Sequence, residues 1–166
     1  IIVSCSLIMA NEKKYTAKDA SKALRKHADR GKAEILQRFF KTGPGEYGEG
    51  DIFVGIVVPK IRETAKTFQV LSFVEIRKLI YSEIHEERLL ALFVLVAQFS
   101  KGTDEQRKKI FDFYLKHSSR VNNWDLVDLS ADKIVGQYLV DNRASIPLLE
   151  TLAHSSSLWR RRIAVI

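Results

Sequence analysis

The chain has 166 residues, of which 46% are hydrophobic and 28% charged, a composition that excludes a disordered chain and favours a globular one. Its 27 Lys and Arg outnumber 20 Asp and Glu, so the formal net charge is +7. Such an excess favours a polyanionic partner, either nucleic acid or an acidic membrane surface, although a basic surface without a partner would have the same composition. The single cysteine, Cys5, excludes an internal disulfide framework and favours a reducing compartment, so we expect a cytoplasmic protein.

The first ten residues, IIVSCSLIMA, are apolar but too short to span a bilayer, and they lack the basic start of a secretory signal. Met9, the only methionine, opens a polar run typical of the start of a protein. We therefore interpret residues 1–8 as an upstream or artificially added segment and residues 9–166 as a single domain. No longer charge-free apolar run follows, so we expect no membrane-spanning segment.

Helical periodicity dominates the chain, and the period-two alternation of strands is nearly absent. We expect the first helix to begin at Thr16 and a second to cover about 33–41. The residues that this second helix should turn inward are Ile35, Leu36, Phe39 and Phe40. The Gly-rich stretch 42–50, TGPGEYGEG, has no Lys-Ser or Lys-Thr after its glycines. It is therefore predicted to be an exposed connector rather than a phosphate-binding loop.

The remaining helices follow in short pieces. Pro59 suits the first turn of a third helix. Further helices are expected near 72–82, 86–99, 104–117, 144–153 and from 157 onward, with Gly102-Thr103-Asp104 supplying a stop and a cap. Asn122 or Asn123 should cap the helix that carries WDLVDLSADKIVGQYL.

A weak internal repeat accompanies these helices. Trp124 and Trp159 lie 35 residues apart, and each follows a polar cap and opens a helix. Ala91 and Ala164 lie 73 residues apart, close to two such periods. Helical repeats of about 33–47 residues stack into solenoids with a concave binding face. The sequence thus predicts an all-α, HEAT-like helical-repeat solenoid of antiparallel helix pairs; because it ends inside the apolar run RRRIAVI, we expect it to be truncated at its C-terminus.

The segment NNWDLVDLSAD, residues 122–132, could carry chemistry. With about 100° per residue, Asp128 lies roughly 40°, Asp132 roughly 80° and Asp125 roughly 100° from Trp124 around the helix. A tryptophan and up to three carboxylates would then share one exposed arc, opposite a core side made of Val127, Ala131, Ile134 and Val135. One period later, Trp159 is followed by Arg160, Arg161 and Arg162.

Each of these residues also has a structural interpretation. Trp124 could be an ordinary core residue, Asp125 and Asp128 could serve the helix dipole, and residues 160–162 could be a solvated basic run. Against this, a carboxylate on a DNA-binding face costs affinity by repelling phosphate. A protein that keeps one there is expected to use it.

Three motifs together carry a resemblance to a known family. They are W-D-x-V-D at 124–128, x-W-x-x-R-x-A at 158–164 and F-x-G-I-x-x-P-x-x-R at 53–62. In this combination the chain, from about residue 18 to 166, resembles the AlkD-type family, HEAT-like bacterial and archaeal DNA glycosylases that excise alkylated purines.

The resemblance implies roles for individual residues. Asp128 would be the catalytic carboxylate, Trp124 would line the lesion site, and Arg162 would contact nucleic acid beside it. A second site tryptophan of the family would lie beyond residue 166. Candidates for further DNA contacts are Trp159, Arg161, Lys60, Arg62 and Lys66.

The implied chemistry suits these side chains. Alkylation at N3 or N7 makes a purine cationic and a good leaving group, so a carboxylate that stabilises the oxocarbenium-like sugar or orients water is sufficient. No cofactor or metal is implied, since the four histidines lack zinc-site spacing. We expect a monomer that binds duplex DNA containing alkylated purines, is associated with the nucleoid and has no membrane partner. The alternative is a non-catalytic HEAT-repeat module that binds nucleic acid or a protein.

Overall fold

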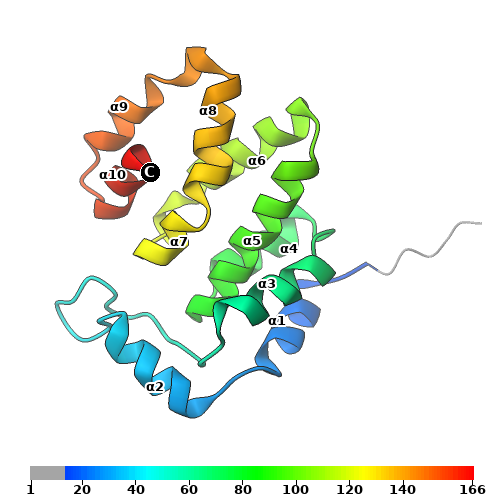
Figure 1. Cartoon of the computed structure of the whole chain (residues 1–166), viewed down its shortest axis with the longest axis vertical. Helices are drawn as coiled ribbons and strands as arrows, with labels where there is room; N and C mark the ends of the chain where they lie inside the picture. Colours follow the sequence, from blue (N-terminus) through cyan, green and yellow to red (C-terminus); the bar gives the residue numbers. More distant parts are fainter. Residues whose placement is uncertain (1–13) are drawn as a thin grey trace, which may run out of the picture.

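Helix α5, His85–Lys101, runs through the centre of the fold and contacts α3 (Val58–Thr67), α4 (Phe73–Ile80) and α6 (Asp104–Lys116) (Figure 1). Its middle, Leu89–Leu95, is apolar on every side and fully buried, as expected of a helix surrounded by others. The computed structural model describes residues 14–166, so the expectation for residues 1–8 lies outside the described part.

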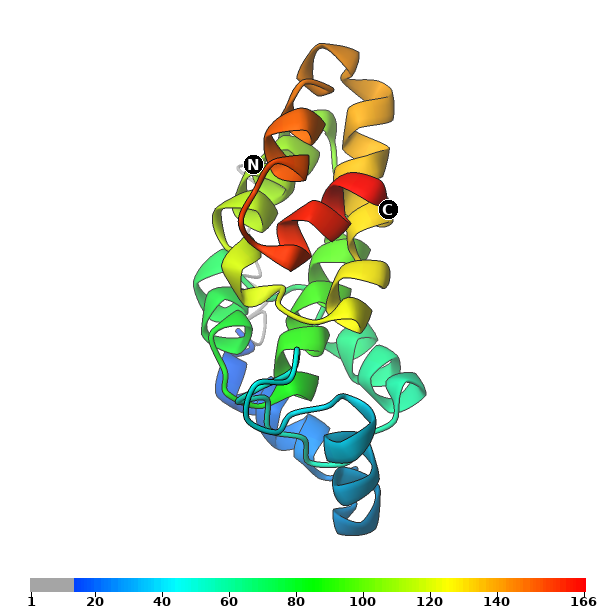
Figure 2. The ribbon, with the colours of Figure 1, turned by 90° about the vertical axis from the view of Figure 1, so that its left-hand side faces the viewer.

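The other helices form layers on either side of α5. Helices α1 (Ala17–Arg25), α4 and α6 lie along one side, and α2 (Arg30–Phe39), α3 and α8 (Gln137–Asp141) along the other (Figure 2). At the far end, α9 (Leu148–Ala153) packs against α10 (Leu158–Val165). Within residues 14–166 there is no strand, only an isolated bridge between Ile52 and Ile84. The prediction of an all-α helical-repeat fold is confirmed.

Local signals place most helix starts where the sequence predicted them. Thr16 and Thr103 form capping boxes with Asp19 and Gln106, and Pro59 lies in the first turn of α3. None of the helices described within residues 14–166 is long and apolar enough to cross a membrane.

Helix α2 departs from the prediction. It begins at Arg30, capped by Asp29, three residues before the expected start, and it contains no fully buried residue. Ile35 is 58% and Phe39 61% exposed, so the expectation that both face the core is wrong. Only the residue after the helix, Phe40, is buried, because α2 lies at the margin of the fold and periodicity alone does not say whether a neighbour covers an apolar stripe.

The helix expected to carry WDLVDLSADKIVGQYL is bent. It consists of α7 (Trp124–Asp128), a turn at 129–130, a π-helical turn (Asp132–Gly136) and α8. The Ser130 hydroxyl donates to the carbonyl of Leu126 at 2.5 Å and bonds the Tyr114 hydroxyl at 2.9 Å, a back-bonding pattern that bends helices. The predicted core side of Val127, Ala131, Ile134 and Val135 is buried throughout.

The segment that leads into α3 wraps around a buried carboxylate. The amides of Val54, Gly55 and Ile56 all donate to Glu86, at 3.1, 2.8 and 3.1 Å. This wrapping requires glycine, because Gly55 has φ +83° and a Cβ there would lie 2.0 Å from the carbonyl oxygen of Asp29. The backbone geometry of this segment therefore explains the glycine of the F-x-G-I motif.

Candidate functional site

Both tryptophans line one cavity of about 570 Å³, formed by α7, α10 and the Gly-rich loop. Its lining residues are Tyr47, Trp124, Leu158, Trp159, Arg161, Arg162, Val165 and Ile166. The repeat spacing of the two tryptophans thus brings them to a shared space from successive helix pairs. Of the sequence-predicted site residues, this cavity unites Trp124, Trp159, Arg161 and Arg162.

The Gly-rich loop does more than connect two helices. Tyr47 at its tip packs edge-on against Trp159, with ring centroids 6.1 Å apart. The next residue, Gly48, is buried, and a Cβ there would lie 2.3 Å from the carbonyl oxygen of Phe40. The loop is mostly exposed, as predicted, but the interpretation as a plain connector missed its aromatic contribution to the cavity wall.

Asp128 does not itself line this cavity, but it bonds Arg162, which does. Two guanidinium nitrogens of Arg162 donate to the two carboxylate oxygens of Asp128, each at 2.6 Å, in the bidentate arrangement that arginine favours. The hydrogen bonds to Asp128 raise the pKa of Arg162, although burial acts to lower it. Both side chains remain partly open to solvent, 29% for Asp128 and 40% for Arg162, so an incoming ligand can reach the pair.

Trp124 is half-buried and belongs to a cluster of rings. Its indole stacks on Phe40 with centroids 5.1 Å apart and planes 11° apart, and Phe40 stacks on Phe53 at 4.7 Å. Phe53 in turn stacks on the imidazole of His85 at 4.3 Å. One face of Trp124 is therefore packed, which fixes its ring plane, and the residue also lines the cavity.

Asp125 does not share the exposed arc that the helical geometry predicted. Its side chain is buried, and the residue is 6% exposed. One oxygen accepts from the amide of Leu126 at 2.8 Å, and the other contacts Nε2 of His85 at 2.8 Å. The correction has a tertiary cause: α5 covers this side of α7 and supplies a partner that the helical wheel does not include.

His85 belongs to a buried polar cluster with Asp51, Arg88, Asn123 and Asp125. Nδ1 of His85 lies 2.9 Å from Asp51, which also accepts from Arg88 and, at 3.1 Å, from Asn123. Burial alone would raise the pKa of Asp51, but the hydrogen bond from His85 and the charge of Arg88 hold it below its usual value. Burial alone would lower the pKa of His85, but its bonds to Asp125 and Asp51 raise it.

In the sequence, His85 was considered only as one of four histidines that lack zinc-site spacing. A signal was present in HEER, residues 85–88, directly before the apolar run LLALFVL. A helix that is apolar all round is buried, so charged residues at its start must have partners. All four are buried, and all four have hydrogen-bond partners.

The remaining predicted DNA contacts lie outside the Asp128–Arg162 pair. Arg161 donates to the carbonyls of Ser155 and Ser156 at 2.8 and 2.9 Å. On α3, Lys60 pairs with Glu63 at 2.8 Å, the guanidinium of Arg62 lies 4.3 Å from the centre of the Phe93 ring, and Lys66 is exposed. The three α3 residues do not line the cavity.

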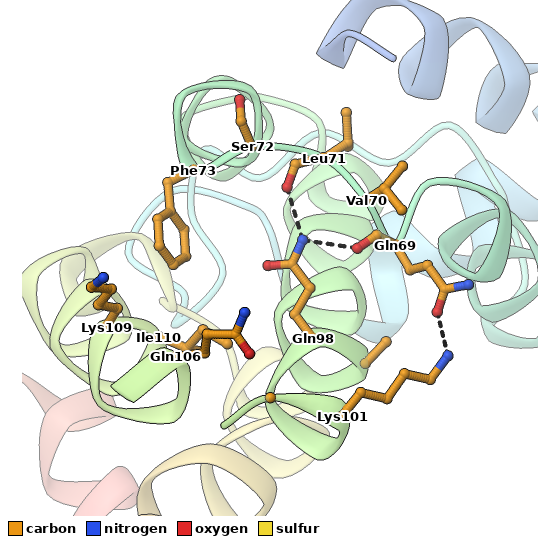
Figure 3. Close-up of a pocket in the computed structure, with 12 residues that line it drawn as sticks. Gln69, Val70, Leu71, Ser72, Phe73, Gln98, Lys101, Gln106, Lys109 and Ile110 are labelled. Carbon is orange, nitrogen blue, oxygen red and sulfur yellow. Dashed lines mark hydrogen bonds between the residues drawn. The ribbon is translucent and has the colours of Figure 1, made fainter. Parts of the chain in front are cut away.

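A second cavity of about 600 Å³, between α4, α5 and α6, contains none of the predicted site residues (Figure 3). In it the Gln98 amide donates to the carbonyls of Gln69 and Leu71, both at 2.8 Å, and Lys101 reaches the side chain of Gln69 at 2.6 Å. These bonds tie the turn before α4 to α5. Within residues 14–166, no group of three or more His, Cys, Asp or Glu is placed to hold a metal ion.

Comparison with known proteins identifies the family of the chain. A search of curated proteins found no match. A match was found to the family described as DNA alkylation repair enzyme, over residues 20–166. This range includes α2, the Gly-rich loop, α7 and α10, and thus every element of the cavity. The chain belongs to the DNA alkylation repair enzyme family.

Proposed function

We propose that this protein is a DNA glycosylase that releases N3- and N7-alkylated purines from duplex DNA by hydrolysing the N-glycosidic bond. Its family implies a role in the repair of alkylated DNA. The observation that carries the finer proposal is that Trp124 and Arg162 line one cavity and that Arg162 bonds the carboxylate of Asp128. An aromatic ring, an anion and a cation are thereby available together.

The proposed reaction depends on the carboxylate of Asp128. An N3- or N7-alkylated purine is already cationic and leaves without protonation. As the bond to the base breaks, positive charge develops on the sugar, and a nearby carboxylate stabilises it or orients the water that attacks the sugar. The base leaves with the bonding electrons as a neutral alkylpurine, and water supplies the hydroxyl group and releases a proton.

Arg162 has two possible partners in this proposal. In the free protein its guanidinium is held by Asp128 in two hydrogen bonds. A DNA phosphate presents the same bidentate acceptor geometry. Transfer of Arg162 from Asp128 to the phosphate beside the lesion would free the carboxylate when the substrate is bound.

The aromatic walls suit a cationic base. Trp124, Trp159 and Tyr47 come from three separate segments and line the same space. The face of an aromatic ring attracts a cation by about 0.5–2 kcal/mol, depending on desolvation. A neutral, undamaged purine lacks this cation–π attraction, so the aromatic walls would favour the alkylated base.

The surface charge supports DNA as the ligand. The net charge of +7 favours a polyanion, and Arg161, Lys60, Arg62 and Lys66 remain the candidates for further contacts with the duplex. We propose that they bind phosphates along a concave face of a monomeric protein. Such contacts position the duplex without reading its sequence.

The test is base release from methylated duplex DNA, measured by chromatography of the freed bases. Asp128→Asn preserves the shape but removes the charge, so it should abolish release while DNA binding remains intact or becomes slightly tighter. The matched control is Asp132→Asn, because Asp132 is exposed and its side chain bonds only the adjacent Lys133 among the described residues. Release by Asp128→Asn at the wild-type rate would overturn the assignment. DNA binding by the wild type without any base release would favour a non-catalytic binding module.

A further inference from the structure

His85 lies between two carboxylates, one at each ring nitrogen. Nδ1 is 2.9 Å from Asp51 and Nε2 is 2.8 Å from Asp125, and the residue is only 1% exposed. A neutral imidazole carries one N–H, whereas the imidazolium carries two, and an ionised carboxylate can only accept. Both short contacts are therefore hydrogen bonds when the ring is protonated.

The charges around His85 lead to the same conclusion. The groups that face it are Asp51, from the segment after the Gly-rich loop, Asp125, from α7, and Arg88, from its own helix. With the ring protonated, two cations balance two anions; with the ring neutral, a buried net negative charge remains. Such a charge is costly at low exposure. The bonds to the two carboxylates accordingly raise the pKa of His85 in spite of its burial.

The cluster is attached directly to the first turn of α7. Asp125 is the second residue of that helix, and Asn123 is its cap. Asn123 donates to Asp51 and accepts from the Trp124 amide at 2.8 Å. The residue before Trp124, Asn123, is thus held by Asp51, and the residue after it, Asp125, is held by His85.

The rings provide a second link. His85, Phe53 and Phe40 contact one another, with ring centroids 4.3 to 5.2 Å apart, and Phe40 stacks on Trp124 at 5.1 Å. Asp128 follows Trp124 by one helical turn and lies on the same side of α7. The position of His85 therefore bears on the ring plane of Trp124 and on the place of the Asp128 carboxylate.

We propose that His85, held as an imidazolium between Asp51 and Asp125, is a positioning residue that fixes the first turn of α7 and with it Trp124 and Asp128. His85 does not touch the cavity and acts through its two carboxylate partners. When it loses its proton, one of the two bonds is lost and the start of α7 is released. The catalytic part of this inference rests on the proposed glycosylase function, whereas the protonation state and its effect on Trp124 do not.

The first experiment uses the wild-type protein and needs no DNA. The ¹⁵N shifts of His85 report whether both ring nitrogens carry protons, and 5-fluorotryptophan labelling gives one ¹⁹F signal for each of the two tryptophans. We expect an imidazolium at pH 7, and a Trp124 signal that moves at the pH where His85 loses its proton. The signal of Trp159, which is in α10, should not follow that transition. A neutral His85 ring at pH 7, or a Trp124 signal that does not shift when His85 loses its proton, would overturn the proposal.

The second experiment separates positioning from general damage by rescue. The amide of His85→Gln has one NH₂ donor group and one acceptor oxygen, so the oxygen is left facing a carboxylate. Asp125→Asn turns that carboxylate into a donor. We expect His85→Gln to lower kcat for base release by up to about 100-fold with little change in KM, as for a misplaced catalytic group. The double variant His85→Gln with Asp125→Asn should recover most of the lost kcat.

In the wild type, kcat should fall at alkaline pH as His85 loses its proton. Asp125→Asn alone allows a neutral His85 to make both hydrogen bonds, so this fall of kcat should disappear. The matched control is His117→Gln, since His117 is buried but faces the Tyr81 hydroxyl instead of a carboxylate. Equal losses from both histidine variants, or no rescue by Asp125→Asn, would overturn the positioning role. A wild-type protein that releases no base would refute the proposed function, and the ¹⁵N and ¹⁹F signals would still decide the state of His85.

Discussion

Two carboxylates of helix α7, Asp125 and Asp128, lie three residues apart and have different surroundings. Asp125 is buried against α5 and belongs to a cluster whose partners are all within the fold. Asp128 is 29% exposed and is held by one arginine of the cavity wall, from α10, that is itself 40% exposed. Neither the residue type nor the local helix distinguishes them; the neighbouring helices do.

The difference determines what each ion pair can do. Removing one member of a buried charge cluster leaves an unpaired charge in a poorly solvated place, which costs several kcal/mol. A partly exposed pair gains little from its own contact, because water competes for both ions. The Asp128–Arg162 pair can therefore exchange one partner for a phosphate, whereas the cluster around His85 keeps its arrangement.

The largest effect is expected from breaking the closed cluster. Arg88→Met removes the cation that bonds Asp51 and should lower the free energy of unfolding by about 3–5 kcal/mol. Urea unfolding followed by circular dichroism measures this loss. Lys108→Met is the matched control, because Lys108 forms an exposed pair with Asp112 and should lose less than about 1 kcal/mol. Equal losses would mean that the buried cluster contributes no more than a surface pair.

The second prediction compares the two aspartates in catalysis. Asp128→Asn should lower the rate of base release by at least about 10²–10³-fold, the range found when one electrostatic stabiliser of a transition state is removed. Asp125→Asn should lower it by less than about tenfold near neutral pH, because the amide keeps one hydrogen bond to a neutral His85. Single-turnover release from methylated DNA measures both rates. A larger loss from Asp125→Asn would move the catalytic role into the closed cluster.

The third prediction concerns stability against pH. The pKa of His85 is raised in the folded protein. Its stabilising effect is therefore fully present below the unfolded value of about 6.5, and it is lost as pH rises through the folded pKa. The free energy of unfolding should fall over this alkaline window in the wild type and fall less in Asp125→Asn, which lacks one of the two carboxylates. Parallel slopes in urea titrations at several pH values would contradict the prediction.

The smallest effect on stability is expected at the open pair. Arg162→Ala should change the free energy of unfolding by less than about 1 kcal/mol, because the pair is partly exposed. It should nevertheless weaken duplex DNA binding and reduce the slope of log K against log salt by about 1. Fluorescence anisotropy at several salt concentrations measures the slope. A wild-type affinity that does not depend on salt would indicate a partner other than DNA.

Much of the helical architecture follows from local signals. Caps at Thr16, Thr103 and Asn123, and Pro59 in a first turn, mark helix starts because each satisfies or avoids the unpaired amides found there. The prediction was wrong for α2, where an apolar stripe with Ile35 and Phe39 remains largely exposed. It was incomplete after Asp128, where hydrogen bonds of Ser130 bend the helix.

The sequence by itself determined the helical periodicity, the basic charge and the spacing of Trp124, Trp159 and Arg162, because these depend only on residue order. Only the tertiary structure decided which carboxylate is buried, that Tyr47 joins the cavity wall, and that His85 lies between Asp51 and Asp125. The physical reason is that these contacts join residues 34 to 112 positions apart, and burial and pairing of charges depend on neighbours that one helix cannot specify.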